Sequence, residues 1–198
     1  MPDAKTLHFY DTSADKYAAL TKIEKPGANL KAFMALLPAG GHVLDLGCGP
    51  AQASVHLRNA GFVPDPVDAS QGMVTLANDT HDIGARLMTF DDLDAVEAYD
   101  GVWANFSLLH APKKDLPRHM AAIANALRPA GIFHIGMKTG EGEHRDSIDR
   151  LYTYVTVPEL HGLLVQAGFE ILSTEEGEEL GCAGTVDPYV IMRARKLG

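Results

Sequence analysis

A short apolar segment with one carboxylate runs into a glycine-rich turn, a pattern typical of nucleoside-binding sites. Val43-Leu44-Asp45-Leu46 has the composition of a buried strand, and Gly47-Cys48-Gly49 follows it directly. Glycine permits positive φ and lacks the Cβ atom that would hold a ligand away from the backbone. A second acid, Asp68, closes the next apolar segment about 20 residues later, where strand carboxylates bind ribose hydroxyls. The spacing predicts a nucleoside-containing cofactor.

Further side chains able to do chemistry follow the third and fourth apolar segments. Asp91 and Asp92 come after the third, and Asn105 comes after the fourth. Open parallel sheets bind ligands at the carboxyl ends of their strands, so these side chains are expected beside the glycine turn. His110 lies just beyond Asn105 and is the candidate general base, because imidazole titrates near neutral pH. A hydrogen bond at the start of a helix is the alternative role for His110.

Alternating strand and helix patterns must position these residues. This alternation predicts a parallel sheet with helices on both faces. Proline is poorly tolerated in a central strand, so Pro64 and Pro66 should shorten the second one. Asp115 is a plausible helix N-cap, and Pro129 is expected to end that helix. The expected strands are 42–46, 63–68, 85–90, 99–104 and 131–137, the helices are 14–20, 29–37, 51–60, 70–79, 115–128 and 158–167, and segments 169–175 and 186–194 form a closing hairpin.

The order of these motifs resembles that of the class I S-adenosylmethionine (SAM)-dependent methyltransferases, whose acidic first strand precedes Gly-x-Gly-x-Gly. Ala51 occupies the third glycine position, where alanine is acceptable if only close helix–strand packing is needed. The resemblance implies a Rossmann-like α/β fold: a seven-stranded, mostly parallel sheet with an antiparallel last strand and helices on both faces. It covers roughly residues 40 to 195, and its segments are 43–51, 67–73, 90–93, 99–105 and 127–133.

This resemblance implies SAM as the cofactor and suggests a role for each matching residue. Asp45 would lie beneath the methionine end, and Asp68 would bind both ribose hydroxyls. Asp92, in preference to Asp91, would accept the adenine amino group, with turn capping as the alternative. Met73 would pack on adenine or fill the core. The candidate cofactor-binding residues are Asp45, Gly47, Cys48, Gly49, Asp68, Ala69, Met73, Asp91, Asp92, Leu93, Asn105, Tyr10 and Tyr17.

Tyr10 and Tyr17 belong to an N-terminal helical region that in related enzymes folds over the cofactor. They would contact the methionine carboxylate or anchor that region by packing and a hydroxyl bond.

A long charged stretch, 138–154, follows the fifth strand at the same edge of the sheet. Long loops at such positions are often binding loops or lids. Its cations and aromatic rings predict a substrate with an anionic or polar group, and the alternative is a solvated loop with internal ion pairs. Its acids and its histidine lack a metal-ligand spacing, so no metal is expected. The candidate substrate-binding residues are Lys138, Arg145, Arg150, Tyr152 and Tyr154.

Charge, cysteine content and hydropathy limit the classes of partner and the cellular setting that we expect. The 198 residues carry a formal net charge of −9, and the 17 Lys and Arg are scattered, which argues against a nucleic-acid partner. Cys48 and Cys182 lie far apart without metal spacing, which favours a reduced cytoplasmic setting. No stretch approaches the roughly 18 apolar residues of a membrane span, and the start does not resemble a signal peptide. Oligomeric state is beyond the sequence.

These observations predict a small, single-domain bacterial-type methyltransferase that acts on a small molecule. The domain would span 1–198, with an N-terminal helical cap at 1–40, a cofactor-binding core at 41–137, and a substrate loop and hairpin at 138–198. The acceptor atom stays open among oxygen, nitrogen, sulfur and a metalloid. An NAD(P)-binding oxidoreductase is the first alternative, opposed by the acid in the first strand and by the closing hairpin. A non-catalytic SAM-binding protein is the second.

Overall fold

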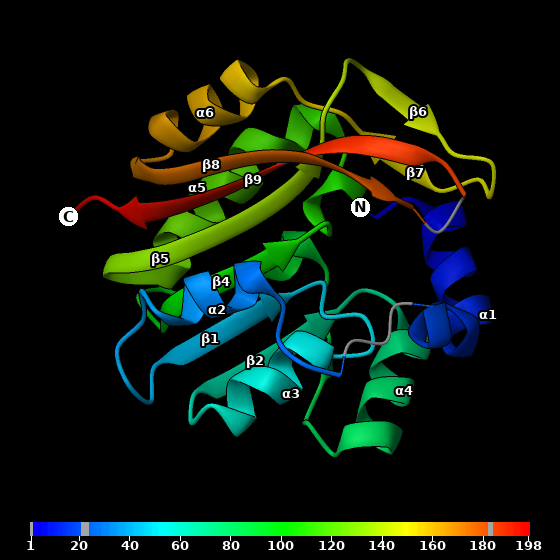
Figure 1. The fold of residues 1–198 in the computed structure, drawn as a ribbon, viewed down its shortest axis with the longest axis horizontal. Coiled ribbons are helices and arrows are strands. Elements are labelled where there is room, and N and C mark those ends of the chain that lie inside the picture. The colour runs from blue at the N-terminus through cyan, green and yellow to red at the C-terminus, as the bar shows by residue number, and fades with distance from the viewer. Residues whose placement is uncertain (1, 21–23, 182–183) are drawn as a thin grey trace.

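The computed structural model describes residues 2–20, 24–181 and 184–198, so Cys182 lies outside the described residues. Seven strands form one sheet in the order β3-β2-β1-β4-β5-β9-β8 (Figure 1). Neighbouring strands from β3 to β5 are parallel, and β9 runs antiparallel to β5 and β8. The predicted Rossmann-like sheet is therefore confirmed. The strands are β1 (His42–Leu46), β2 (Val63–Asp68), β3 (Arg86–Leu87), β4 (Tyr99–Asn105), β5 (Leu127–Lys138), β8 (Phe169–Leu180) and β9 (Val186–Lys196).

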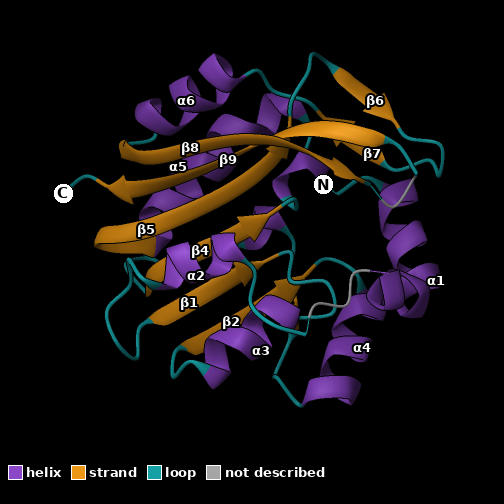
Figure 2. Cartoon of the chain, viewed as in Figure 1, coloured by secondary structure: helices purple, strands orange, loops and turns teal. Residues whose placement is uncertain are grey.

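Helices cover both faces of the sheet (Figure 2). Val43, Trp103 and Ile132 pack with residues of α2 and α3, whereas the neighbour of each in sequence packs in a larger cluster with α5 and α6. This alternation follows from the two-residue period of a strand. None of the described helices is long and apolar enough to cross a membrane. The helices are α1 (Ala4–Leu20), α2 (Ala28–Met34), α3 (Gln52–Asn59), α4 (Gln71–His81), α5 (Leu116–Ala126) and α6 (Val157–Gln166).

The two prolines do not shorten β2, contrary to the sequence prediction. Val63 donates its N–H to Gly41 at 3.0 Å, so the alternating Pro64 and Pro66 turn their missing N–H groups away from β1. On that outer side β3 pairs only with the last two residues of β2. The prolines therefore occupy an unpaired edge, where no ladder hydrogen bond is lost.

Several element boundaries differ from the prediction. Helix α1 begins at Ala4 rather than near 14 and contains a kink at Ser13. Strand β3 has only two residues, and a short 3-10 turn at Phe90–Asp92 follows it. Helix α5 ends at Ala126, so Pro129 lies within β5 instead of at the helix end. Asp115 is at the N-cap of α5 but makes no capping hydrogen bond through its side chain.

The charged stretch after β5 is not an unstructured loop. It contains β6 (Glu143–Arg145) and β7 (Leu151–Thr153), which form an antiparallel pair. Helix α1 is bound to this pair: the Leu151 N–H donates to Thr6 Oγ1 at 2.9 Å, and Arg145 pairs with Asp3 at 2.7 Å. The N-terminal helix and the stretch at 138–154 thus form one connected layer.

Candidate ligand-binding site

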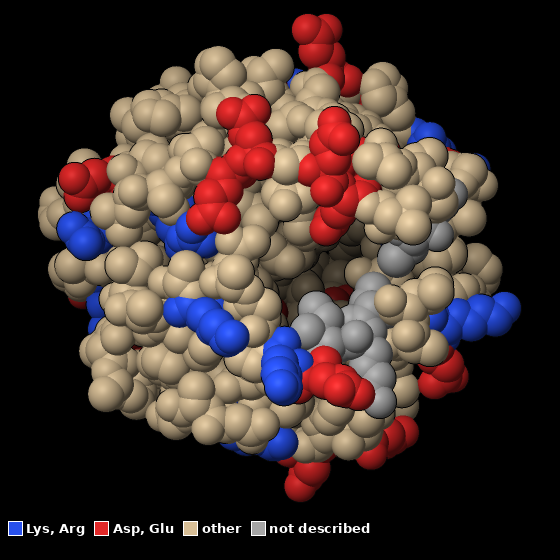
Figure 3. Space-filling model, in the orientation of Figure 1, with Lys and Arg blue, Asp and Glu red and all other residues tan. Residues whose placement is uncertain are grey.

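A cavity of about 400 Å³ lies at the carboxyl ends of β1, β2 and β4. The surface is hollowed near the middle of the view in Figure 3. Its wall combines the turn after β1, the end of β2, the segment after β4, helix α1 and the inner face of the β8–β9 hairpin. This is the edge at which open parallel sheets bind ligands.

Gly47 fixes the shape of the turn that enters the cavity. Its φ is +80°, and a Cβ atom there would lie 2.4 Å from the Cβ of Ser107. The Gly47 and Cys48 N–H groups both donate to the Val67 carbonyl at 2.9 Å. Only glycine satisfies both the conformation and the close approach of Ser107, so the turn is held rigidly against β2 and β4.

The position of Ala51 requires a left-handed backbone conformation as well as close packing. The prediction for the third glycine position, which considered packing alone, was therefore incomplete. The φ of Ala51 is +57°, in the left-handed region, and its side chain is fully buried. A non-glycine residue there costs roughly 1–2 kcal/mol. Burial of the Ala51 methyl group with Val74, Ala77 and Ala85 offsets part of that cost.

Asp45 is a buried carboxylate in the floor of the cavity. It is 2% exposed, and Ser54 Oγ donates to its Oδ2 at 2.7 Å. Burial raises the pKa of Asp45 to about 7, and the hydrogen bond from Ser54 offsets part of that shift. Asp45 therefore exchanges its proton near neutral pH, and a positively charged ligand group would favour its ionised form.

Asp68 is held in place by backbone N–H groups on both sides. Gly49 donates to its Oδ2 at 2.8 Å, and Ser70 donates to its Oδ1 at 2.9 Å. Desolvation raises the pKa of Asp68, and these two N–H groups lower it in part. Each carboxylate oxygen retains a lone pair, so the group can accept two further hydrogen bonds.

The cavity wall includes Asp91 and not Asp92, which reverses the expected preference. Asp92 accepts from the Thr89 N–H at 2.9 Å and from Thr89 Oγ1 at 2.7 Å in a capping box. Asp91 lines the cavity and pairs with Arg118 at 2.6 Å. Leu93 packs against the main core and is not part of the wall.

Three further predicted cofactor residues lie in the wall. Ala69 and Met73 are both there, and Met73 is fully buried near the N-terminus of α4. Cys48 is also buried in the wall, and desolvation raises the pKa of its thiol above the usual range. The thiol is therefore protonated and unreactive at neutral pH.

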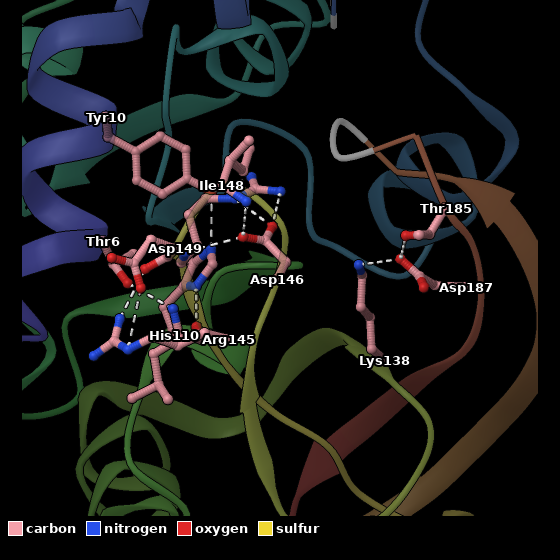
Figure 4. A network of polar contacts seen from close by, with 12 residues as sticks. Thr6, Tyr10, His110, Lys138, Arg145, Asp146, Ile148, Asp149, Thr185 and Asp187 are labelled. Atoms are coloured by element: carbon pink, nitrogen blue, oxygen red, sulfur yellow. Dashed lines mark hydrogen bonds and ion pairs between the residues drawn. The ribbon is translucent and has the colours of Figure 1, made fainter.

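Tyr10 and His110 meet across the cavity wall (Figure 4). His110 Nδ1 lies 2.8 Å from the Leu151 carbonyl, which can only accept, so Nδ1 carries the proton. Nε2 accordingly accepts from the Tyr10 hydroxyl at 2.9 Å, and Arg150 donates to that same oxygen at 3.0 Å. Removal from bulk water lowers the pKa of His110 to about 4, so the imidazole is neutral at pH 7. Tyr17, which also lines the cavity, packs edge-on against Tyr10.

Asn105 lines the cavity at the end of β4, with more than a third of its surface exposed. His134 Nε2 lies 3.0 Å from its Oδ1. This bond comes from a histidine buried in β5, the strand beside β4.

The five predicted substrate residues do not line the cavity. Lys138 pairs with Asp187 (Figure 4), and Arg145 pairs with Asp3. Arg150 is 2% exposed and pairs with Asp146 at 2.7 Å. Tyr152 is buried under the Lys138 ammonium, and Tyr154 packs near Tyr152. All three cations of this stretch are therefore engaged in ion pairs, two of them with acids outside the stretch and one with an acid inside it.

The wall is acidic and contains no Lys or Arg among the residues that the structure describes. Such a wall favours neutral or cationic ligand groups over anionic ones. Its carboxylates are Asp3, Asp45, Asp68, Asp91, Asp115 and Glu179.

Several wall residues carried no signal in the sequence. Trp103, Tyr189 and Ile191 look like ordinary strand residues in the sequence, and no local pattern shows which side of the hairpin meets the cavity. Met88, Phe90 and His119 line the end of the cavity at which Asp91 lies. The alternation of Tyr189 and Ile191 along β9 was the one available hint, because it puts both on one face.

Comparison with known proteins gives a consistent result. Residues 43–131 match the model of a family described as a methyltransferase domain. The chain is 29% identical over 149 residues to a ubiquinone biosynthesis O-methyltransferase of Xanthomonas axonopodis pv. citri (strain 306), with 65% of this chain and 61% of the relative covered. It is 32% identical over 136 residues to the 27-O-demethylrifamycin SV methyltransferase of Amycolatopsis mediterranei (strain S699), with 64% and 47% covered. The chain thus spans less than two thirds of the length of these curated relatives.

A solved structure extends the likeness to nearly the whole chain. It is the Burkholderia thailandensis 1,6-didemethyltoxoflavin-N1-methyltransferase with bound 1,6-didemethyltoxoflavin and S-adenosylhomocysteine. It matches with a TM-score of 0.75 and 25% identity, and the match covers 98% of this chain and 88% of that one.

Proposed function

We propose that this chain, identified by its fold and its sequence matches as a class I SAM-dependent methyltransferase, transfers a methyl group from SAM to a small-molecule acceptor. The observation that carries the proposal is Asp68. Its two oxygens are aligned by the Gly49 and Ser70 N–H groups at the cavity, with lone pairs left for two adjacent hydroxyls. A ribose presents such a pair of hydroxyls.

The residues present fit SAM. A Cβ atom on Gly49 would have just one neighbour within 4 Å among the described residues, a ring carbon of Tyr17 at 3.9 Å, so the missing side chain keeps the wall of the cavity free. Asp68 would hold the ribose, Asp45 would lie beneath the methionine end, and Met73 and Asp91 would border the adenine. Bound SAM supplies an electrophilic methyl group on a sulfonium sulfur. The chain's own task is to orient the acceptor and exclude water.

We propose that Tyr10 and His110 accept the proton that the acceptor loses on methylation. The Tyr10 hydroxyl already donates to His110 Nε2 and accepts from Arg150, so its oxygen can take a proton as its own moves to the imidazole. The low pKa of His110 makes it a weak base. A weak base is sufficient for an oxygen acceptor, whose proton becomes strongly acidic once the new C–O bond has formed.

The wall also supports a choice of acceptor. Without a Lys or Arg among its described residues, it is better suited to an uncharged or cationic molecule than to the anionic one predicted from the sequence. Trp103, Phe106 and Tyr189 add aromatic surface to the cavity wall. The names of the relatives point to oxygen and ring-nitrogen acceptors.

The test is calorimetric titration of the purified protein with SAM, S-adenosylhomocysteine, NAD and NADP. Binding of the first two alone supports the proposal, whereas binding of a nicotinamide cofactor contradicts it. Asp68→Ala should weaken SAM binding on the order of 100-fold, because two charge-assisted hydrogen bonds are lost. Asp79→Ala, on the exposed side of α4, is the matched control and should bind as the wild type does.

A methyl-acceptor screen would then separate an enzyme from a SAM-binding protein without activity. His110→Ala should lower turnover of the acceptor found and leave SAM affinity nearly unchanged. An equal loss of turnover and SAM affinity would place His110 in cofactor binding instead.

A further inference from the structure

A polar pair is buried where an apolar one would be expected. His134 lies in the middle of β5 and is 0% exposed. It stacks on Trp103 with ring centroids 3.7 Å apart and an angle of 15°, and Phe33 of α2 packs edge-on against it. The strand on either side of it, from Ile132 to Met137, is otherwise buried and apolar. A phenyl ring would fill this place at no polar cost.

The imidazole uses only one of its nitrogens. Nε2 bonds to Asn105 Oδ1, and because an amide oxygen only accepts, the proton is on Nε2. Nδ1 is buried and has no partner among the described residues. An unsatisfied buried acceptor is destabilising. The arrangement therefore costs stability and is explained better by the bond to Asn105 than by core packing.

The neighbouring strand is shaped to receive Asn105. In the β4–β5 register Asn105 lies opposite Gly136, two residues beyond His134. A Cβ atom on Gly136 would lie 2.9 Å from Asn105 Oδ1 and 3.3 Å from the Phe106 N atom. The absence of that atom leaves the space in which the Asn105 carboxamide oxygen turns toward β5.

We propose that His134 is a positioning residue, whose Nε2–H holds the Asn105 carboxamide by its oxygen and presents the amide nitrogen to the ligand in the cavity. The two N–H donors of that nitrogen suit a carboxylate or carbonyl oxygen of the ligand. The inference rests on the proposed function, because SAM and S-adenosylhomocysteine are the ligands with which it is tested.

The decisive variant is His134→Phe, which keeps the ring stacked on Trp103 and removes both the donor and the orphaned nitrogen. A residue with a purely structural role would lose stability on substitution. A positioning role predicts an unchanged or higher melting temperature together with affinities for SAM and S-adenosylhomocysteine that fall about 5- to 10-fold. Unchanged affinities would overturn the inference.

A double-mutant cycle tests whether His134 affects ligand binding through Asn105. Asn105→Ala should weaken binding at least as much as His134→Phe, and the double variant should be no weaker than Asn105→Ala alone. Additive losses would show that His134 acts on the ligand by another path. Gly136→Ala, which crowds the carboxamide without altering His134, should weaken binding in the same direction.

Two further measurements separate the inference from loss of fold and from failure of the proposed function. Phe133→Leu alters the opposite face of the same strand, so it should lower the melting temperature and leave the affinities unchanged. Nitrogen-15 spectra of the imidazole should show the Nε2-protonated form, and the Nδ1-protonated form would contradict the proposed bond. A wild-type protein that binds neither ligand would refute the proposed function, whereas a normal wild type with unaffected His134→Phe would refute only this inference.

Discussion

At the scale of single residues, the buried carboxylates of the cavity are energetically costly groups. Asp45 is enclosed by β1 and α3, and its hydrogen-bond partner, Ser54, is uncharged. An ionised carboxylate there is disfavoured relative to water, which is why its pKa rises to about 7. The buried carboxylate therefore lowers stability, and such a cost is common at functional sites.

Asp45→Asn should stabilise the protein and weaken SAM binding. Because the pKa is raised, the folded state holds a proton between about pH 4 and pH 7 that the unfolded state releases, so wild-type stability falls as pH rises through that window. Asparagine does not titrate. Its stability advantage should therefore grow by about 2–3 kcal/mol from pH 5 to pH 8, as measured by urea unfolding at each pH.

Asp100→Asn is the matched control for that experiment. Asp100 pairs with Arg128 at 2.6 Å and accepts from the His42 N–H at 2.8 Å, so neutralising it should destabilise the protein. An advantage of Asp45→Asn that does not change with pH would show that the carboxyl group is not protonated in the folded state.

At the scale of elements, β5 begins directly after α5 and contains an irregularity near its start. Leu127 pairs with Tyr99 and Ile132 pairs with Gly101, so 128–131 lie opposite Asp100 alone. The pairing is interrupted there by a bulge, in which Ala130 has a φ of +62°. Pro129 and Ala130 are exposed, so this turn depends on backbone conformation rather than on burial.

Ala130→Gly should stabilise the protein by about 0.5–1 kcal/mol. The left-handed conformation is strained for alanine and free for glycine, and the strain relieved exceeds the added flexibility of the unfolded chain. The melting temperature should rise by about 1–4 °C in scanning calorimetry. Ala60→Gly, at an exposed site with φ of −87°, should lower it instead. The same sign for both substitutions would contradict this account.

At the scale of the whole molecule, acidic side chains are concentrated at the cavity. The net charge is −9, and acidic side chains lie beside the hollow in Figure 3. The cations near the cavity are paired: Arg145 with Asp3 and Lys138 with Asp187. The six wall carboxylates outnumber the two arginines that pair with them, Arg118 and Arg145, so we expect a negative field at the cavity that favours SAM, with its sulfonium charge, over S-adenosylhomocysteine, which lacks that charge.

Salt should weaken SAM binding more than S-adenosylhomocysteine binding. Between roughly 0.01 M and 1 M salt the Debye length falls from about 30 Å to about 3 Å, which screens the carboxylates of the wall. The ratio of the two Kd values should shift by roughly two- to threefold toward S-adenosylhomocysteine in calorimetry at the two salt concentrations.

Glu179→Gln should reduce this salt effect, because Glu179 lines the cavity. Glu178→Gln is the control, since the adjacent residue of β8 is exposed and is not part of the wall. A ratio that does not depend on salt would mean that the wall charges do not reach the sulfonium.

The sequence by itself determined the order of the elements and the residues that line the cavity at the ends of β1 and β2. Asp45, Gly47, Gly49 and Asp68 are consecutive features of a β-turn-α-β pattern, so their positions follow from local chain geometry and the parallel sheet. The closing hairpin was predicted from two sequence segments, and the seven-stranded, mostly parallel sheet was implied by the resemblance to the class I methyltransferases.

Only the tertiary structure decided which of the remaining side chains face the cavity and which are held in contacts within the protein. Whether Arg145 faces a substrate or Asp3 depends on a contact across 142 residues, and the bond from His134 to Asn105 depends on the β4–β5 register. The prolines of β2 are tolerated because β3 happens to be short on their side. Local patterns state which side chains are available, but pairing between distant segments determines which of them remain free for a ligand.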